Sequence, residues 1–180
     1  HCEDEQIIRA NMESYRAMGT QVPISAHPLI RSREACVRST EKAMNWAEKY
    51  NANLHVLHIS TTDELSLLSA GSYENKRITA ETCPHYLFFS DEDYASMGAR
   101  IKCNPAIKTA ADREALRMAV CAGKIDTIGS DHAPHLLADK QGDCTQAVSG
   151  FPSLQHNLPL LFDLAEQGCF SIVDVVRTMA

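Results

Sequence analysis

Three short segments with β-branched residues alternate with segments of helical periodicity, and this alternation constrains the fold more than any other feature of the sequence. The segments are LHVLHI at residues 54–59, which is largely apolar, RITAET at 77–82 and IDTIGS at 125–130. Short apolar segments with β-branched residues are typical of buried strands. Strands separated by helices imply βαβ units on a parallel sheet, so we expect an α/β fold.

The segments around these strands carry helical signals. Apolar residues recur on one helical face from Glu5 to Met18, and Gly19 ends the pattern. Ser32 is a good N-cap for a second helix that reaches about Tyr50. Further helices are expected over residues 63–71, 111–122, 153–167 and 171–180, with a loop and one helical turn over 83–108 and a polar loop up to about residue 152.

The number of strands is too small for a closed barrel. An eight-stranded α/β barrel takes about 250 residues, whereas this chain has 180 residues and three expected strands. We therefore expect a single, incomplete domain over residues 1–180. The chain begins with His1 rather than Met and continues at once into helix-like sequence, so we also expect an upstream segment to be absent.

Composition excludes several classes of partner. The net charge is -6, and the 17 basic residues form no cluster that could follow a nucleic-acid backbone. No apolar run approaches the roughly 18 residues that span a bilayer, and no signal peptide is recognisable, so we expect a cytoplasmic protein without membrane contact. The seven cysteines are odd in number and never spaced as CxxC, which favours reduced, buried thiols.

Polar side chains follow the expected strands at the place where α/β barrels form their active sites, the carboxyl ends of the strands. His58 lies at the end of the first strand, on the strand face opposite to His55, and Asp131 directly follows the third strand. His1 occupies the equivalent position after a strand that would lie upstream. Two imidazoles and one carboxylate suit Zn²⁺, although spacing alone leaves a structural role open for each.

Five motifs occur along the chain: HCED at 1–4, HVLHIST at 55–61, ITAETCPHYL at 78–87, KCNPAIK at 102–108 and SDHAPH at 130–135. In this order and approximate spacing, the sequence resembles the class I dihydroorotases of the amidohydrolase superfamily over nearly its whole length. The resemblance implies the C-terminal portion of a (β/α)8 TIM barrel of the metallo-dependent hydrolase type, with its N-terminal strands missing.

The resemblance also implies roles for individual residues. His1 and His58 would be zinc ligands, and Asp131 would be both a ligand and the catalytic acid/base. Substrate binding would fall to Asn104 and His135 and to backbone groups near Ser149 and Gly150. The segment SGFPS, which contains the last two residues, departs from the glycine-rich loop that is common in the family.

The activity implied by the resemblance is the reversible, zinc-dependent interconversion of L-dihydroorotate and N-carbamoyl-L-aspartate in de novo pyrimidine (UMP) synthesis. The complete enzyme would hold two zinc ions, act on a small molecule and be compatible with a homodimer. Family members also carry an HxH pair, an arginine and a bridging lysine carbamate or aspartate that this chain lacks. We therefore expect the 180-residue chain alone to bind zinc poorly and to turn over little substrate.

Other interpretations stay open. Allantoinases and dihydropyrimidinases (hydantoinases) share the scaffold, and a non-catalytic barrel used for assembly is a third alternative. Several polar residues near the motifs have simpler explanations: packing within a loop for His85, support of a loop for His132, a structural hydrogen bond for Glu81, and a solvated loop for Arg31 and Arg33.

Overall fold

The computed structural model describes residues 1–19 and 21–179. At its centre lies a parallel three-stranded sheet in the order β1-β2-β3, formed by β1 (Leu54–Val56), β2 (Ile78–Thr82) and β3 (Thr127–Ile128). In the register of the sheet, Val56 pairs with Ala80 and Thr82 pairs with Ile128. The expected α/β class and the parallel arrangement of the strands are confirmed.

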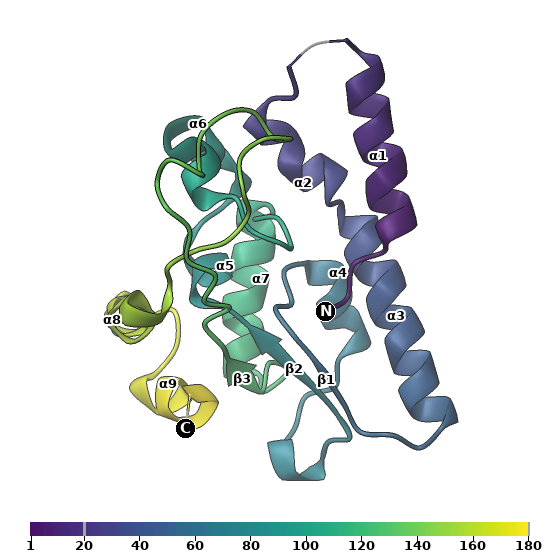
Figure 1. Ribbon diagram of the computed structural model, residues 1–180. Helices are drawn as coiled ribbons and strands as arrows, with labels where there is room; N and C mark the ends of the chain where they lie inside the picture. The colour runs from purple at the N-terminus through teal and green to yellow at the C-terminus, as the bar shows by residue number, and fades with distance from the viewer. Residues whose placement is uncertain (20, 180) are drawn as a thin grey trace.

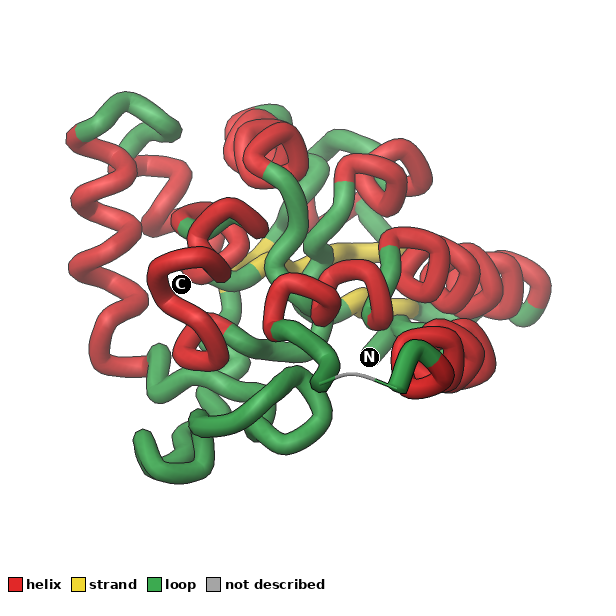
Figure 2. The backbone as a smooth tube through the Cα atoms, turned by 90° about the horizontal axis from the view of Figure 1, so that it is seen from above, coloured by secondary structure: helices red, strands yellow, loops and turns green. Residues whose placement is uncertain are grey.

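Helices lie around much of the sheet, and loops lie along its remaining side, as the view in Figure 2 shows. The helices are α1 (Glu5–Ala17), α2 (His27–Ile30), α3 (Arg33–Lys49), α4 (Thr62–Leu67), α5 (Pro84–Phe88), α6 (Tyr94–Met97), α7 (Ala110–Cys121), α8 (Leu154–Glu166) and α9 (Ile172–Met179). Short 3-10 helices lie at Ile24–Ala26, Tyr73–Asn75, Asp91–Asp93 and Gly98–Ile101. In Figure 1 the long helices α1 and α3 run side by side at one edge, and α8 and α9 lie at the opposite edge.

Side-chain caps explain where the longer helices begin. The Asp4 carboxylate accepts hydrogen bonds from the first turn of α1, and Ser32 caps α3 by accepting a hydrogen bond from the Ala35 N–H. Thr109 and Asp112 form a reciprocal capping box at the start of α7. Each cap satisfies N–H groups that have no partner inside the helix. The helices expected after Asp4 and Ser32 are confirmed to within one residue at either end.

Two apolar cores hold these elements together. The larger one packs the strands against α5, α7, α8 and α9, with Val56, Ile107, Val120 and Leu161 almost completely buried. The smaller one lies beneath α1 and α2. All seven cysteines are free thiols, as expected, but Cys121 is exposed because it lies on the outer face of α7. None of the helices within the described ranges is long and apolar enough to cross a membrane.

The strands are shorter than the sequence suggests. β1 ends at Val56 and β3 ends at Ile128, although the apolar segments continue to residues 59 and 130. His58 and Asp131, which lie just beyond these ends, have positive φ angles of 44° and 42°. A left-handed residue cannot continue an extended strand, so each chain segment turns where it reaches the edge of the sheet.

Candidate active site

The structure brings two of the three expected metal ligands into contact. His1 Nδ1 lies 2.6 Å from His58 Nε2, and the centres of the two rings are 4.7 Å apart. His58 is buried, and this burial, together with the nearby N-terminal charge, lowers its pKa to about 4. His58 is therefore a neutral imidazole at neutral pH, which is the form that coordinates metal ions.

The backbone beyond β1 and β3 places both His58 and Asp131 at the carboxyl end of the sheet. After His58 the parallel pairing resumes for one residue, where the Ile59 N–H donates to the Glu81 carbonyl. Beside Asp131, the Gly129 N–H donates to the Thr82 carbonyl. The alternation of side chains along a strand was expected to set the direction of the two side chains. The strands end before these residues, so the left-handed backbone at His58 and Asp131 sets the direction instead. Positive φ angles at non-glycine residues are uncommon and cluster at functional sites.

Asp131 lies apart from the pair of histidines. Within residues 1–19 and 21–179, no group of three or more His, Cys, Asp or Glu side chains is close enough to hold a metal ion. Burial raises the pKa of Asp131. Burial also raises the pKa of the Cys83 thiol, and the charges of Glu81 and Asp131 add to this effect. These neighbours place Asp131 over the carboxyl end of β2, next to the end of β3.

Glu81 is a polar residue whose position the sequence did not reveal. Its carboxylate lies 4.0 Å from His55 Nε2, and burial and the charge of Asp131 both raise its pKa against the opposing effect of His55. A Cβ atom at Gly129 would collide with Glu81 Oε2. Glycine at position 129 therefore leaves the space that the Glu81 carboxylate occupies. The presence of this glycine beside the Glu81 strand was the one feature of the sequence that could have indicated the position of the carboxylate.

The four residues expected to bind substrate divide between two cavities. Asn104 and Ser149 line a cavity of about 460 Å³ between α1, α2 and the loop 144–149, which we call the α1–α2 pocket. His135 and Gly150 line a cavity of about 700 Å³ between α5, α6 and α8, which we call the aromatic pocket. The two cavities meet at the Ser149–Gly150 segment, where the Gly150 N–H donates to the Lys102 carbonyl at 2.9 Å.

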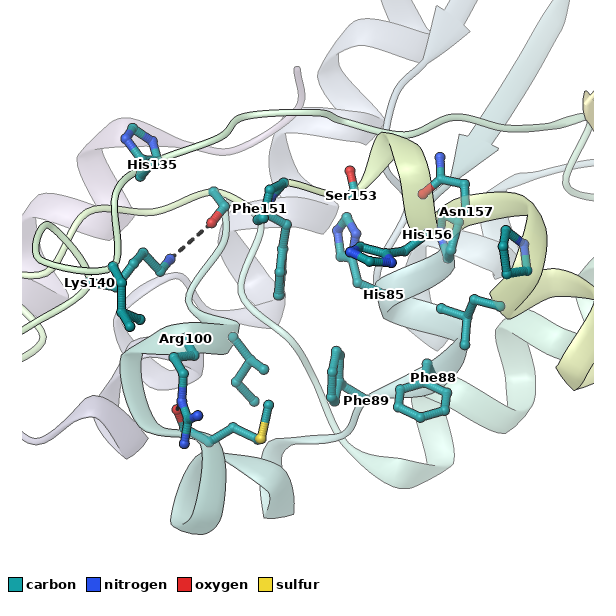
Figure 3. A pocket seen from close by; sticks show the side chains of 18 of the residues that line it. His85, Phe88, Phe89, Arg100, His135, Lys140, Phe151, Ser153, His156 and Asn157 are labelled. Atoms are coloured by element: carbon teal, nitrogen blue, oxygen red, sulfur yellow. Dashed lines mark hydrogen bonds between the residues drawn. The ribbon is translucent and has the colours of Figure 1, made fainter.

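The aromatic pocket is shown in Figure 3, with Phe88, Phe89 and Phe151 among its walls. Lys140 Nζ donates to the Gly150 carbonyl at 2.9 Å and thereby holds the loop that carries Phe151. His85 stacks on Phe151 with ring centres 4.8 Å apart. Burial lowers the pKa of His85 to about 3, and neither ring nitrogen has a hydrogen-bond partner among the described residues. His85 packs inside the loop region, as the sequence suggested.

Arg31 and Arg33 were expected in a solvated loop, but both are held by carboxylates. Arg31 Nη1 donates to Glu3 Oε2 at 2.6 Å, and the Arg31 side chain is only 21% exposed. Arg33 pairs with the buried carboxylate of Asp112 and with Asp63. The reason is tertiary, because the carboxylate partners come from distant parts of the chain: Glu3 precedes α1, Asp63 lies on α4 and Asp112 lies on α7. His132 Nδ1 accepts a hydrogen bond from the Leu154 N–H and supports its loop, as expected.

Comparison with known proteins extends this description. No protein-family model matches the chain. An allantoinase of Streptomyces avermitilis is 36% identical over 150 residues, which are 83% of this chain and 34% of the allantoinase. A dihydroorotase of Geobacter sulfurreducens is 30% identical over 180 residues, which are 100% of this chain and 41% of the dihydroorotase.

Solved structures give the same grouping. An L-hydantoinase (dihydropyrimidinase) from Arthrobacter aurescens is 27% identical with a TM-score of 0.92, over 100% of this chain and 41% of that one. A dihydroorotase from Saccharomyces cerevisiae in complex with 5-fluoroorotic acid has a TM-score of 0.72 at 18% identity, over 82% of this chain and 42% of that one, and supports the fold alone.

The chain spans about two fifths of the length of these relatives. Its parallel sheet with surrounding helices corresponds to part of their barrel, as expected from the sequence. Dihydroorotases are numerous among the curated relatives, and the solved structures include hydantoinases, a dihydropyrimidinase and a dihydroorotase. The chain therefore belongs to the amidohydrolase family of cyclic amide hydrolases, within which it resembles dihydroorotases.

Proposed function

We propose that this chain contributes the site of a zinc-dependent dihydroorotase, which opens and closes one ring amide between L-dihydroorotate and N-carbamoyl-L-aspartate in pyrimidine synthesis. The observation that carries the proposal is the 2.6 Å approach of His1 Nδ1 to His58 Nε2 at the carboxyl end of the sheet. The dihydroorotases among the relatives support it. A catalytic role is favoured over a scaffold because the exposed imidazole of His1 and the buried imidazole of His58 face each other, an arrangement with a chemical use.

The donor groups fit a zinc ion in their chemistry. His1 and His58 present nitrogen atoms to each other, and the low pKa of His58 keeps it available for coordination. We propose that His1 and His58 hold zinc and that Asp131, which lies apart from them in this structure, joins them as a ligand when the ion is bound. The zinc would lower the pKa of a bound water and polarise the ring carbonyl. We further propose that the complete enzyme holds two ions, and that the other ligands belong to the part of the relatives' length that this chain does not span.

In this proposal Asp131 handles the proton. Its carboxyl group would take a proton from the attacking water and return it to the ring nitrogen that leaves. Burial raises the pKa of Asp131, which brings the group closer to the range where it can both accept and donate a proton. The strand-end turn at Asp131 would keep the carboxyl group aimed at the reacting bond.

Substrate binding would use both sides of the Ser149–Gly150 segment. Asn104 and His135 would bind the substrate carboxylate, while backbone groups of Ser149 and Gly150 would contact the ring. The side-chain oxygen Asn104 Oδ1 is buried without a hydrogen-bond partner among the described residues. An unsatisfied buried acceptor is costly, so an N–H group of the substrate ring that donates to Oδ1 would be stabilising. The NH2 group of the same side chain would donate to the substrate carboxylate. We propose a small-molecule substrate and a homodimeric complete enzyme without nucleic-acid or membrane partners, in the cytoplasm.

The test is an assay of the chain with zinc against L-dihydroorotate, dihydrouracil and allantoin. We expect specific binding of L-dihydroorotate with little turnover, because further metal ligands are required. Rapid turnover by the chain alone would contradict that requirement. Preferred binding or hydrolysis of allantoin would favour the second candidate, an allantoinase, which the 36% identity to the Streptomyces avermitilis protein supports. Absence of zinc from the complete enzyme, once purified, would favour a non-catalytic role.

A further inference from the structure

We propose that Lys140 is a positioning residue of the candidate active site, and that its ammonium group fixes two substrate-binding segments relative to Asp131. The 102–104 segment ends at Asn104, and the 148–150 segment has Ser149 at its centre. The inference rests on the proposed function, because that function assigns the substrate contacts to these segments. Lys140 itself lies in the long loop between β3 and α8, where it lines the aromatic pocket.

The Lys140 ammonium group uses all its N–H donors on backbone carbonyls. Nζ donates to the carbonyl oxygens of Lys102 at 2.8 Å, Gly150 at 2.9 Å and Val148 at 3.0 Å, and Figure 3 shows the bond to Gly150. An ammonium group has three donors and no acceptor, so none is left for a ligand. Lys140 is 8% exposed, and no ion pair among the residues that the structure describes includes it. Lys140 therefore holds backbone groups and does not bind substrate itself.

The three carbonyls join two segments that are distant in the sequence. Lys102 begins the 102–104 segment, whereas Val148 and Gly150 flank Ser149 on both sides. The Gly150 N–H also donates to the Lys102 carbonyl at 2.9 Å, so this oxygen receives donors from Lys140 and from the 148–150 segment. The Lys140 side chain therefore fixes the position of the two segments relative to each other.

The 148–150 segment continues into a stretch of chain that is hydrogen-bonded beside Asp131. The Phe151 carbonyl accepts a hydrogen bond from the Ala133 N–H at 2.9 Å, and Phe151 forms a parallel β-bridge with His132. His132 directly follows Asp131 in the chain. A shift of the 148–150 segment would therefore change the position of Asp131 relative to the proposed substrate contacts.

Gly150 is also packed tightly against the residues that follow Asp131. A Cβ atom at Gly150 would lie 2.5 Å from the Ala133 carbonyl oxygen and 3.0 Å from His135 Cδ2. The φ of Gly150 is 137°, a value that only glycine adopts readily. Contact therefore limits the movement of Gly150 toward His135, and the hydrogen bonds from Lys140 to the 148–150 segment restrain its other movements.

The carbonyl oxygens compensate for the burial of the Lys140 charge. Burial lowers the pKa of Lys140 to about 8, Cys103 opposes this effect, and the positive charge of Lys102 adds to it. A buried cation without partners is strongly destabilising, and the three carbonyls supply those partners. Methionine is a flexible side chain without a donor. The change Lys140→Met therefore removes the three hydrogen bonds while an unbranched side chain still fills the space.

The first measurement is amide hydrogen exchange of the 180-residue chain, unaltered and with Lys140→Met. We expect the Gly150 and Ala133 N–H groups to exchange about 10-fold faster, which corresponds to the loss of about one hydrogen bond. The Gly129 N–H, which donates to the Thr82 carbonyl, should exchange at an unchanged rate. Equal acceleration of all three groups would mean that Lys140 only adds stability, and no acceleration at Gly150 would mean that it holds nothing. Either result would overturn the proposal.

Lys124→Met is the matched control, because Lys124 is partly buried and its Nζ also donates to a backbone carbonyl, that of Leu65 at 2.9 Å. This variant should leave exchange at Gly150 unchanged. Lys140→Arg keeps a charged donor group and should retain part of the protection at Gly150. If Lys140→Met does not fold, Lys140→Arg decides the question. Its different donor geometry should accelerate exchange at Gly150 more than at Gly129, and an equal change at both would overturn the proposal.

The second measurement is steady-state hydrolysis of L-dihydroorotate by the complete enzyme. A residue that only stabilises the fold changes the amount of active protein, which lowers the apparent kcat and leaves KM unchanged. Because Lys140 fixes the segments that bind substrate, Lys140→Met should raise KM about 10-fold, the effect of one misplaced hydrogen bond. Lys140→Arg should recover part of this loss, and Lys124→Met should keep the KM of the unaltered enzyme. An unchanged KM in Lys140→Met would contradict the positioning role.

Failure of the proposed function and failure of this inference give different results. If the complete enzyme opens dihydrouracil or allantoin but not L-dihydroorotate, the dihydroorotase assignment is removed, and the KM for that ring tests Lys140 in the same way. If it opens L-dihydroorotate with a KM that does not depend on Lys140, the assignment stands and the inference is removed. If it opens none of the three rings, both are overturned.

Discussion

His1 Nδ1 lies 2.6 Å from His58 Nε2, although the two residues are 57 positions apart in the sequence. At this distance the two ring nitrogens share one hydrogen bond. Since burial lowers the pKa of His58 to about 4, the His58 ring is neutral at neutral pH, which is the form that coordinates metal ions. The contact therefore leads directly to a prediction about zinc.

The chain alone is expected to bind zinc weakly, but zinc at concentrations well above its dissociation constant should stabilise the unaltered chain, and the change His58→Gln should abolish this effect. A ligand that binds only the folded state adds about 2.7 kcal/mol at a free concentration 100 times its dissociation constant. Thermal unfolding with increasing zinc measures the effect, and His156→Gln is the control because His156 is exposed on α8. Equal stabilisation of the unaltered chain and of His58→Gln would rule out His58 as a ligand.

Asp112→Ala should reduce the free energy of unfolding by about 3 kcal/mol, because it leaves charged and hydrogen-bonding partners unpaired. The Asp112 carboxylate is only 2% exposed and accepts hydrogen bonds from Arg33, Thr62 and Thr109. Asp63→Ala is the matched control, since it removes only the exposed partner of Arg33 and should cost less than about 1 kcal/mol. Urea denaturation distinguishes the two values, and similar losses would contradict the assigned role.

The advantage of the unaltered chain over Asp112→Ala should shrink in acid. Burial alone would raise the pKa of Asp112, but hydrogen bonds from Arg33, Thr109 and Thr62 outweigh burial and lower the pKa to about 2. A carboxyl group with a folded-state pKa below its unfolded value of about 3.9 stabilises the protein above that value. This contribution is lost as the pH falls from about 4 to about 2. Urea denaturation of both proteins across this range measures the change, and a constant difference would refute the assignment.

Gly150→Ala should destabilise the protein by about 3 kcal/mol or more, through backbone strain and overpacking. Gly150 has a φ of 137°, and a Cβ atom there would lie 2.5 Å from the Ala133 carbonyl oxygen. Gly168→Ala is the control, because Gly168 also has a positive φ of 81° but nothing lies within 4 Å of its Cβ position. This control should cost about 1 kcal/mol. Chemical denaturation gives both values, and equal losses would mean that the contact with Ala133 has no cost.

His85→Leu should leave the stability unchanged or raise it, whereas His27→Leu should lower it. Both histidines are buried, but neither ring nitrogen of His85 has a partner among the described residues. His27 Nε2 lies 2.8 Å from the Cys103 carbonyl, and its removal would leave that carbonyl unsatisfied at a cost of about 1 to 3 kcal/mol. Melting temperatures of the two variants test this difference. A large loss for His85→Leu would indicate that its nitrogens have a function in the fold.

Local features of the structure followed from the sequence alone. The cap at Ser32 acts on an N–H group three residues away, and the periodicity of α1 and α3 has a similarly short range. The order of strands and helices also implied parallel pairing, which places residues that follow different strands at one edge of the sheet. The sequence thus determined the fold class and the region of the candidate site.

The tertiary structure decided which side chains meet. Strand alternation did not aim His58, because β1 ends at Val56 and a left-handed turn follows. The contact of Arg31 with Glu3 depends on the packing of α1 against the segments around it, across 28 positions of sequence. Contacts of this kind depend on how the whole core excludes water and fixes the helices, whereas helix periods and caps depend only on near neighbours.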